Sequence, residues 1–317
     1  MTGVRRFLAT RLAYALLTLL VISVVTFFAT NVVPANPAKV ALGKFATPQQ
    51  LALYDQQQGL DRPVVERYFT WLGNMASGSW GTSTLSSQSV SSLVGPRVIR
   101  TLILGVLAMA LAVPMAYALG VYSALRAGRP SDLTVSFGAL LINSLPEFVV
   151  GTVFLLVLAV EFHALPIESS AAALGSGSAK IKAYILPVLS LATVLTPYMA
   201  RMVRANVREV SAAPFVRSAV LRGVPRRQVI WRHVVPNATL PVVNVVALSM
   251  AELVGGVVVL ETVFGFPGIG QLLVDSVSSK DIPTVQAIAL IIGIGFVVLN
   301  LLADAFILYL NPRLRSR

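Results

Sequence analysis

Long runs of residues without a charged side chain constrain this chain more than any other feature. Residues 12–38 contain no acidic or basic residue, and residues 101–125 form a second such run. Each run is longer than the roughly 20 residues that an α-helix needs to cross a bilayer. Of the 317 residues, 56% are hydrophobic and only 12% are charged, a balance that is not typical of soluble globular proteins. The sequence therefore predicts an integral membrane protein.

The apolar runs predict an all-α membrane protein with six transmembrane helices. These helices are expected at about residues 10–31, 98–124, 133–160, 183–204, 238–260 and 282–310. Prolines within the runs, such as Pro114, predict bent helices. The topology divides the chain into an N-terminal anchor helix, an extracytoplasmic segment, a transmembrane core and a cytoplasmic tail. Their bounds are 1–31, 32–97, 98–310 and 311–317.

Basic residues set the expected orientation of the chain in the membrane. Arg5, Arg6 and Arg11 precede the first run, and eight arginines lie between positions 201 and 232. Lys and Arg collect in cytoplasmic loops of membrane proteins. We therefore expect a multi-pass protein of the plasma membrane with both termini in the cytoplasm.

The chain lacks the residues that several classes of function require. The chain contains no cysteine, and its two histidines, His163 and His233, form no convincing metal site. The pair Gly43-Lys44 lacks the spacing of a phosphate-binding loop, and no carboxylates are paired at a spacing suited to acid/base catalysis. The net charge is +12, but the basic residues lie beside apolar runs and not in an aromatic-rich basic patch. This distribution argues against binding of nucleic acid. We expect no enzyme, catalytic residue, metal or cofactor in this chain.

A basic stretch at residues 208–237 stands between two apolar runs. Pro214 suits the first position of a helix, and Gly223 followed by Pro225 suits its end, so a short helix is expected between them. A second helical segment begins near Pro225 and is expected to end before Pro236. The first helix would carry a small apolar face formed by Phe215, Val216, Ala219, Val220 and Gly223.

Motifs in this stretch and elsewhere resemble one family of membrane proteins. The basic stretch contains Phe215-Val216-Arg217-Ser218-Ala219, then Arg222-Gly223, and later His233, Pro236 and Asn237. This pattern is similar to the "EAA" loop of membrane subunits in binding-protein-dependent ABC importers, in the form found in the dipeptide/oligopeptide branch. Two further stretches resemble that branch, Ser144-Leu145-Pro146-Glu147-Phe148 with Gly151, and Glu261-Thr262 with Phe264-Gly265 and Pro267-Gly268.

The resemblance implies a type I ABC importer permease fold, with an external segment between helices 1 and 2, in a bacterial or archaeal plasma membrane. It implies a permease subunit of an ATP-driven importer that translocates di- or oligopeptides delivered by an external solute-binding protein. The implied partners are a second homologous permease subunit and two ATPase domains, which bind ATP and Mg. Members of this branch also carry nickel complexes, glutathione or other small solutes. An ion-coupled secondary transporter is the more distant alternative.

Three groups of residues carry the site predictions. By resemblance, coupling to the ATPase subunit is assigned to the loop residues Phe215, Val216, Arg217, Ser218, Ala219, Arg222, Gly223, Val224 and Pro225. Small residues there would let a partner approach the backbone, whereas the plain alternative is a basic cytosolic loop. The candidate external loop contacts are Glu261, Phe264 and Phe266.

The third group is the candidate translocation path, which comprises Glu147, Pro146, Asn143 and Glu252. Glu147 lies near the middle of the third run. An ionised side chain at that depth costs about 2.5–3.5 kcal/mol on insertion scales, so we expect Glu147 to face a water-filled cavity or a partner, or to be protonated. Pore lining is one hypothesis for Glu147, and a helix kink or a subunit contact is the other.

Overall fold

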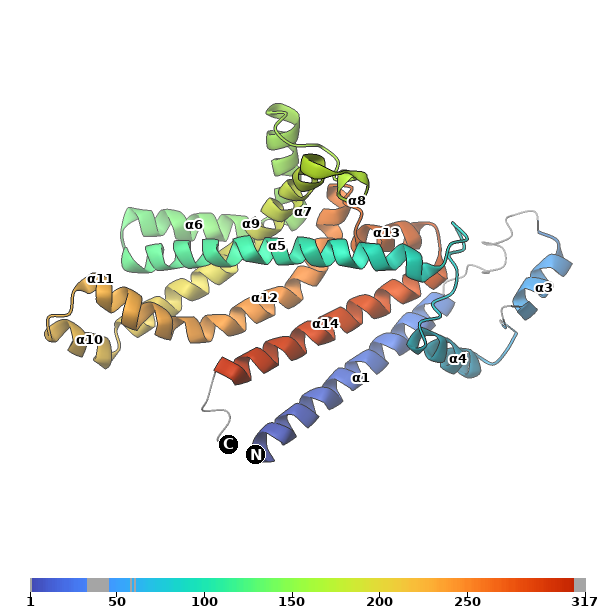
Figure 1. The fold of residues 1–317 in the computed structure, drawn as a ribbon, viewed down its shortest axis with the longest axis horizontal. Helices are drawn as coiled ribbons and strands as arrows, with labels where there is room; N and C mark the ends of the chain where they lie inside the picture. The colour runs from blue at the N-terminus through green and yellow to red at the C-terminus, as the bar shows by residue number, and fades with distance from the viewer. Residues whose placement is uncertain (1, 33–45, 58, 60, 311–317) are drawn as a thin grey trace. The chain divides into compact units, whose positions relative to one another are not determined.

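The computed structural model describes residues 2–32, 46–57, 59 and 61–310. The predicted tail at 311–317 and part of the predicted extracytoplasmic segment lie outside these residues. The described chain is helical almost throughout and contains no β-strand, only an isolated antiparallel bridge between Thr82 and Ser89 (Figure 1). The all-α class expected from the sequence is confirmed.

Four helices of the described chain are long and apolar enough to cross a membrane. They are α1 (Thr2–Val32), α5 (Val90–Leu125), α9 (Gly177–Ser211) and α14 (Ile282–Leu310). Two bent pairs of helices bring the number of candidate spans to six when each pair is counted as one span. These pairs are residues 130–161, which comprise α6 (Pro130–Ser144), α7 (Glu147–Phe154) and the π-helix η1 (Leu155–Glu161), and residues 226–250.

The chain forms two compact units. The first consists mainly of Thr101–Pro267, and the second consists of Arg6–Arg100 together with Gly268–Val298. The sequence-based division placed residues 268–298 in the 98–310 core, whereas their contacts group them with the N-terminal part. In the second unit, Ile288 on α14 is fully buried against Val90 and Val94 at the start of α5.

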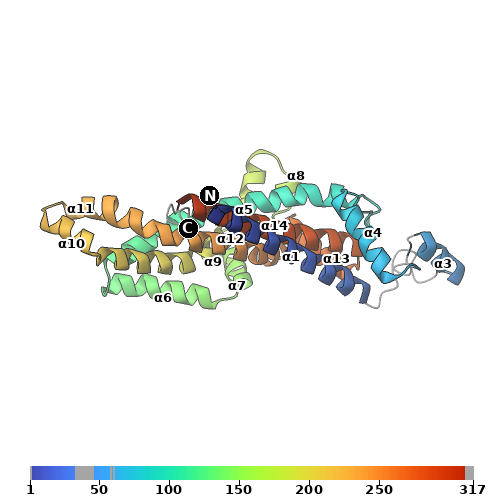
Figure 2. The same cartoon turned by 90° about the horizontal axis from the view of Figure 1, so that it is seen from below.

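In the first unit, α9 lies between other long helices. It contacts α6, α7, α8 (Ala171–Leu174) and α12 (Val235–Val263). The part of α5 in this unit approaches α9 closely, since a Cβ added to Gly120 would lie 2.6 Å from the carbonyl oxygen of Ala200. Both views show α6, α9 and α12 as one layer of helices from which α7 departs steeply (Figures 1 and 2).

In the second unit, buried polar groups are tied to neighbouring segments. The carboxylate of Asp281 is only 3% exposed and accepts hydrogen bonds from the hydroxyl of Ser83 at 2.6 Å and from that of Thr284 at 2.7 Å. It also accepts bonds from the backbone N–H and the hydroxyl of Thr84 at 3.0 and 3.1 Å. These bonds fix the loop before α5 to the start of α14.

Candidate functional site

The basic stretch folds as expected at its first helix. Helix α10 (Pro214–Leu221) has its proline in the first turn, and Gly223 follows its C-cap residue Arg222 with φ +79°. The N–H of Gly223 bonds to the carbonyl of Val220 at 3.0 Å, and the N–H of Val224 bonds to that of Ala219 at 3.2 Å. This pair of bonds is the Schellman motif, which requires a residue in the left-handed conformation after the helix. The predicted bounds of this helix are confirmed.

The second helical segment extends farther than the sequence predicted. Helix α11 (Arg226–Val229) continues through the π-helix η2 (Ile230–Val234) directly into α12, so the segment does not end before Pro236. Pro236 lies in the first turn of α12. Because η2 precedes α12 without a break, this proline lies within a continuous helical segment, directly after its π-helical turn.

The apolar face of α10 divides between a buried side and an exposed side. Val216 is 6% exposed and belongs to a cluster of buried valines that includes Val203 and Val207 of α9, with Ala219 packed against it. Phe215 and Val220 of this face are 47% and 54% exposed, and Leu221, which lies outside the face, is 82% exposed. Ala219 is partly buried because it packs on the core of its own chain, and the close approach of a partner at this residue stays a prediction.

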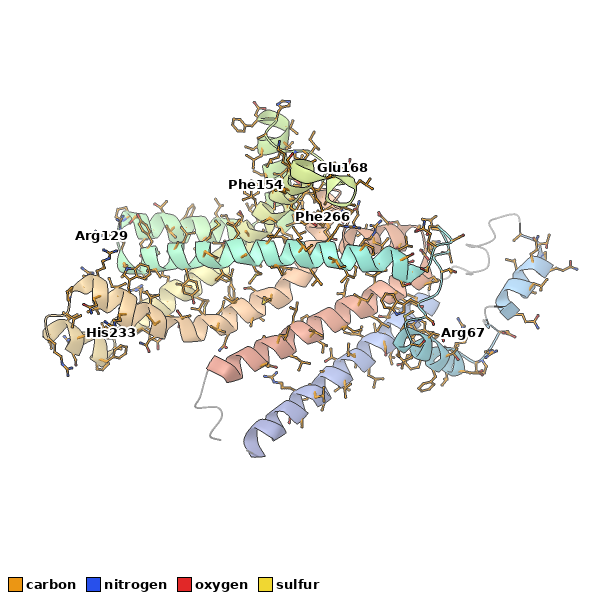
Figure 3. The ribbon with its side chains drawn as sticks, viewed as in Figure 1. Arg67, Arg129, Phe154, Glu168, His233 and Phe266 are labelled. Carbon is orange, nitrogen blue, oxygen red and sulfur yellow. The ribbon has the colours of Figure 1, made fainter. Side chains whose placement is uncertain are left out.

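Arginine side chains surround the exposed part of this segment. These arginines are exposed, and none of them forms an ion pair with another residue that the structure describes. They are Arg217, Arg222, Arg226, Arg227 and Arg232. Trp231 beside them is 60% exposed. Both views place α10 and α11 at the end of the first unit where α5 turns into α6, and Figure 3 shows Arg129 of that turn and His233 of η2 at this end. We call residues 214–232 the coupling segment.

A buried ion pair near this end was not predicted from the sequence. Asp132 of α6 is 1% exposed, and its two oxygens accept hydrogen bonds from Nε and an Nη of Arg204 on α9 at 2.7 and 2.8 Å. Ser123 also donates to the carboxylate, and the N–H of Gly128 donates at 2.9 Å. A planar guanidinium that meets a carboxylate with two bonds fixes direction as well as distance. This pair fastens α6 and the α5–α6 turn to α9, which leads into the coupling segment.

The third predicted span is broken and does not run straight through 133–160. Helix α6 and the α7–η1 helix meet at an angle of 105°. Leu145 has an extended backbone (φ −88°, ψ 136°) because the ring of Pro146 disfavours helical geometry in the residue before it. Glu147 is then the first residue of α7. The alternative that placed Glu147 at a kink is correct as geometry, and it does not exclude a place in the pore.

The structure brings only some of the predicted path residues together. Pro146 and Asn143 are exposed at the break, and Glu147 is half-buried beside them. An Oε atom of Glu147 would lie 2.6 Å from a Cβ added to Gly256 of α12, so this carboxylate rests against the backbone of α12. Glu252 also belongs to α12, but its side chain lies outside the described part of the structure.

The three predicted external loop contacts are core residues in this structure. Glu261, Phe264 and Phe266 are 0%, 1% and 0% exposed. Glu261 accepts a hydrogen bond of 2.5 Å from the hydroxyl of Thr101, and the ring of Phe266 meets that of Tyr184 edge to face at 5.0 Å between centroids. Figure 3 shows Phe266 enclosed near α8, close to Glu168. The prediction of contacts through these side chains is wrong, because burial leaves them no surface for a partner.

Comparisons with known proteins identify the family. The family model described as "Binding-protein-dependent transport system inner membrane component" matches residues 116–316, and a model of the N-terminal part of such membrane components matches residues 4–92. The chain belongs to this permease family. It is thus the membrane component of an ABC import system that works with a binding protein, as the motifs indicated.

Two relatives illustrate how far the likeness of this permease extends. It is 33% identical over 300 residues to the glutathione transport system permease protein GsiC of Salmonella choleraesuis (strain SC-B67), and 33% identical over 303 residues to GsiC of Escherichia coli (strain K12). Each comparison covers 95% of both chains.

The fold of the permease also matches a solved structure. That structure is a chain in the crystal structure of an amino acid ABC transporter with histidines, with a TM-score of 0.52 and 19% sequence identity. The match covers 68% of the permease and 93% of the other chain. The type I ABC importer permease fold is thereby confirmed.

Proposed function

We propose that this permease is the subunit of an ATP-driven importer that translocates di- or oligopeptides, or the related tripeptide glutathione. The observation that carries the proposal is the coupling segment, which presents an exposed Leu221, an exposed Phe215 and five arginines without ion-pair partners in the described chain. Exposed apolar side chains among unpaired charges of one sign suit a partner protein with an apolar pocket and acidic groups. The ATPase domain is the partner of this chemistry, and it binds the ATP and Mg that drive transport.

The proposed assembly contains this permease, a second homologous permease subunit, two ATPase domains and an external solute-binding protein. In this arrangement the coupling segment, the α5–α6 turn and both termini face the cytoplasm. The arginines of the coupling segment support that side, because basic loops stay in the cytoplasm. Closure of the ATPase domains then pulls on the coupling segment. The ion pair between Asp132 and Arg204 passes that movement to α6 and its break at Pro146.

Glutathione is the second candidate substrate. The names of the two GsiC relatives favour it, and peptides are favoured by the likeness of the motifs to the dipeptide/oligopeptide branch. Both substrates share the chemistry of short peptides with a free amino group. Nickel complexes do not, and nothing in the described site offers a metal ligand set, since it contains no group of three His, Cys, Asp or Glu residues able to hold a metal.

Uptake by the reconstituted complex tests the transport function. We expect ATP-dependent accumulation of labelled di- to pentapeptides or of glutathione in proteoliposomes, and no accumulation when the ATPase partner carries an inactivating substitution. Accumulation of a nickel complex but of no peptide would contradict the proposed substrate class and leave the permease architecture intact.

Docking on the ATPase is tested by Leu221→Asp. A charge at the centre of an apolar contact should lower the binding free energy by about 2 kcal/mol or more, as at the hot spots of protein interfaces. We therefore expect the affinity for the ATPase, measured by co-purification, to fall by more than about tenfold. Leu174→Asp on α8 is the matched control, because Leu174 is 91% exposed and lies outside the coupling segment. Equal recovery of the ATPase with Leu221→Asp and with Leu174→Asp would show that Leu221 does not dock.

A further inference from the structure

Glu147 is a carboxylate without a counter-charge among the residues that the structure describes. It is half-buried, and it forms no hydrogen bond and no ion pair with any residue in the described part of the chain. The two apolar runs that meet at this point, residues 133–160 and 238–260, contain no Lys, Arg or His. By contrast, the buried carboxylates of Asp132, Glu261 and Asp281 all accept hydrogen bonds from side chains of the same chain.

The surroundings of Glu147 keep room for its carboxylate. A Cβ on Gly256 would lie 2.6 Å from one of its oxygens, whereas a Cβ on the adjacent Gly255 would meet nothing within 4 Å. A side chain at position 256 would therefore displace the carboxylate from α12. The break at Pro146 places Glu147 at the start of α7 with Asn143 and Pro146 exposed beside it, so a carboxylate and an amide side chain lie where the span is interrupted.

The energetics require a partner for this group. A carboxylate that faced hydrocarbon would be strongly disfavoured, and membrane proteins place such groups toward water, a partner subunit or a transported solute. The first turn of α7 offers a weak positive potential, which favours the carboxylate without neutralising it. No basic group in the described part of the chain supplies the missing counter-charge, which leaves this place open to a group from outside the chain.

We propose that Glu147 is a binding group for a primary ammonium group of the substrate on its way through the permease. This inference rests on the proposed function, because short peptides and glutathione carry a free amino group that is protonated near neutral pH. An ammonium group donates up to three hydrogen bonds and neutralises a carboxylate without a fixed orientation, which suits a solute that passes through. The amino terminus is one source of this group and a lysine side chain is another.

Peptides with a free and with a blocked amino group test the inference. The complex is reconstituted with its ATPase and binding protein, and uptake is measured for trialanine, N-acetyl-trialanine and N-acetyl-Ala-Lys-Ala at equal occupancy of the binding protein. The same binding protein serves every permease variant, so its own preference cancels when variants are compared. We expect Glu147→Gln to lower trialanine uptake at least tenfold and to change N-acetyl-trialanine uptake less than twofold. Glu147→Asp keeps the charge and should retain the preference for the free amino group.

The lysine peptide identifies the source of the ammonium group. If N-acetyl-Ala-Lys-Ala loses uptake in Glu147→Gln as trialanine does, any primary ammonium group serves, and if it does not, Glu147 reads the amino terminus. Glu161→Gln is the control, since Glu161 is an exposed carboxylate at the far end of η1 and should leave all three rates unchanged.

Three outcomes would overturn the inference while peptide transport itself persists. They are an unchanged ratio of free to blocked peptide in Glu147→Gln, an equal loss for all three peptides, and loss of the second permease subunit from the purified complex. The last outcome would place Glu147 at a subunit contact. If the wild-type complex transports no peptide at all, the proposed function fails, and the inference that rests on it fails with it.

Discussion

Carboxylates that are buried or half-buried in the described part of this permease fall into two kinds at the scale of single residues. Asp132 and Asp281 have both oxygens bound by donors from neighbouring segments, so the cost of removing their charge from water is offset within the chain. Glu147 has no such donors in the described chain. The first kind therefore holds elements together, and the second is available to a solute.

The ion pair between Asp132 and Arg204 should contribute strongly to stability. Removal of Arg204 leaves the buried charge of Asp132 without its partner, so a loss of about 3–5 kcal/mol in the free energy of unfolding is expected for Arg204→Ala. The loss for Asp132→Ala should be smaller, because the side chain of Arg204 is 28% exposed and can be solvated. The double variant Asp132→Ala/Arg204→Ala should be destabilised by clearly less than the sum of the two single variants, with a coupling above about 1 kcal/mol. Unfolding of the detergent-purified complex by denaturant measures the cycle.

The exposed pair of Arg62 and Glu66 provides the control for that cycle. These two side chains are 58% and 53% exposed and lie 3.2 Å apart. Water and salt screen such a pair, so its coupling should stay below about 1 kcal/mol. Similar couplings for the two pairs would mean that burial of Asp132 adds nothing to the bridge.

Asp281 should hold the loop before α5 in place. Asp281→Asn keeps the size of the side chain but turns an acceptor into a donor, which then faces the donors Ser83, Thr84 and Thr284. We expect faster proteolysis within residues 79–89, mapped by mass spectrometry of the purified complex. Asp275→Asn is the control because Asp275 is exposed on α13 (Ile269–Ser278), and equal cleavage in both variants would contradict a role for the Asp281 bonds.

Such pairings explain why sequence alone predicted some polar residues and missed others. Glu147 was found because a lone carboxylate in an apolar run is visible in the sequence. Asp132 was missed because it stands at the edge of a run and its partner Arg204 lies 72 positions away. Glu261 was wrongly predicted to lie at the surface, because the hydrogen bond from Thr101 that satisfies its buried carboxylate joins positions 160 apart.

At the scale of helices, proline and glycine residues predicted where a helix ends better than they predicted the angle at which the next helix continues. Pro214 and Gly223 gave the bounds of α10, and the predicted sixth span coincides with α14. The 105° angle after α6 was not predicted. A proline removes one hydrogen bond and restricts its neighbour, but the packing of both helices against α9 decides the angle. The same limit applies at Pro236, where the helix continues.

Substitutions at Gly223 separate a backbone role from contact with a partner. A Cβ at this position meets nothing of this chain within 4 Å, so the positive φ is a sufficient reason for glycine. If only the backbone matters, Gly223→Ala should destabilise the end of α10 by about 1 kcal/mol, while Gly223→Asn should cost less because asparagine tolerates this conformation. Substrate-stimulated ATP hydrolysis should then be retained better in the asparagine variant. The reverse order, with the larger asparagine worse than alanine, would show that the ATPase subunit presses on Gly223.

At the scale of the whole molecule, the order of spans followed from the sequence and the grouping into units did not. Apolar runs and basic loops are local patterns, so α1, α5, α9 and α14 could be expected near their observed bounds. The association of residues 268–298 with the N-terminal unit depends on buried contacts such as that of Ile288 with Val94. These contacts join distant parts of the chain, and no local pattern encodes them.

The orientation that the arginines predict for the permease has a direct test, because the chain contains no cysteine. Single cysteines can therefore be introduced without background labelling of native cysteines. The chosen positions carry exposed side chains, so the substitution disturbs no packing. We expect a membrane-impermeant maleimide to label Ser86→Cys and Leu174→Cys in intact cells. Ala127→Cys in the α5–α6 turn and Gln228→Cys in the coupling segment should be labelled only after permeabilisation.

The four positions test the topology together, because Ser86 and Leu174 are predicted outside the cell and Ala127 and Gln228 inside it. In the six-span topology, one span separates each labelled position from a protected one. Helix α5 lies between Ser86 and Ala127, and α9 lies between Leu174 and Gln228. Labelling of Gln228→Cys in intact cells would place the coupling segment outside, where no ATPase could reach it. Labelling of Ala127→Cys and Leu174→Cys on the same side would instead mean that the broken helices α6 and α7–η1 enter and leave the membrane on one side, so that the break at Pro146 belongs to a re-entrant loop.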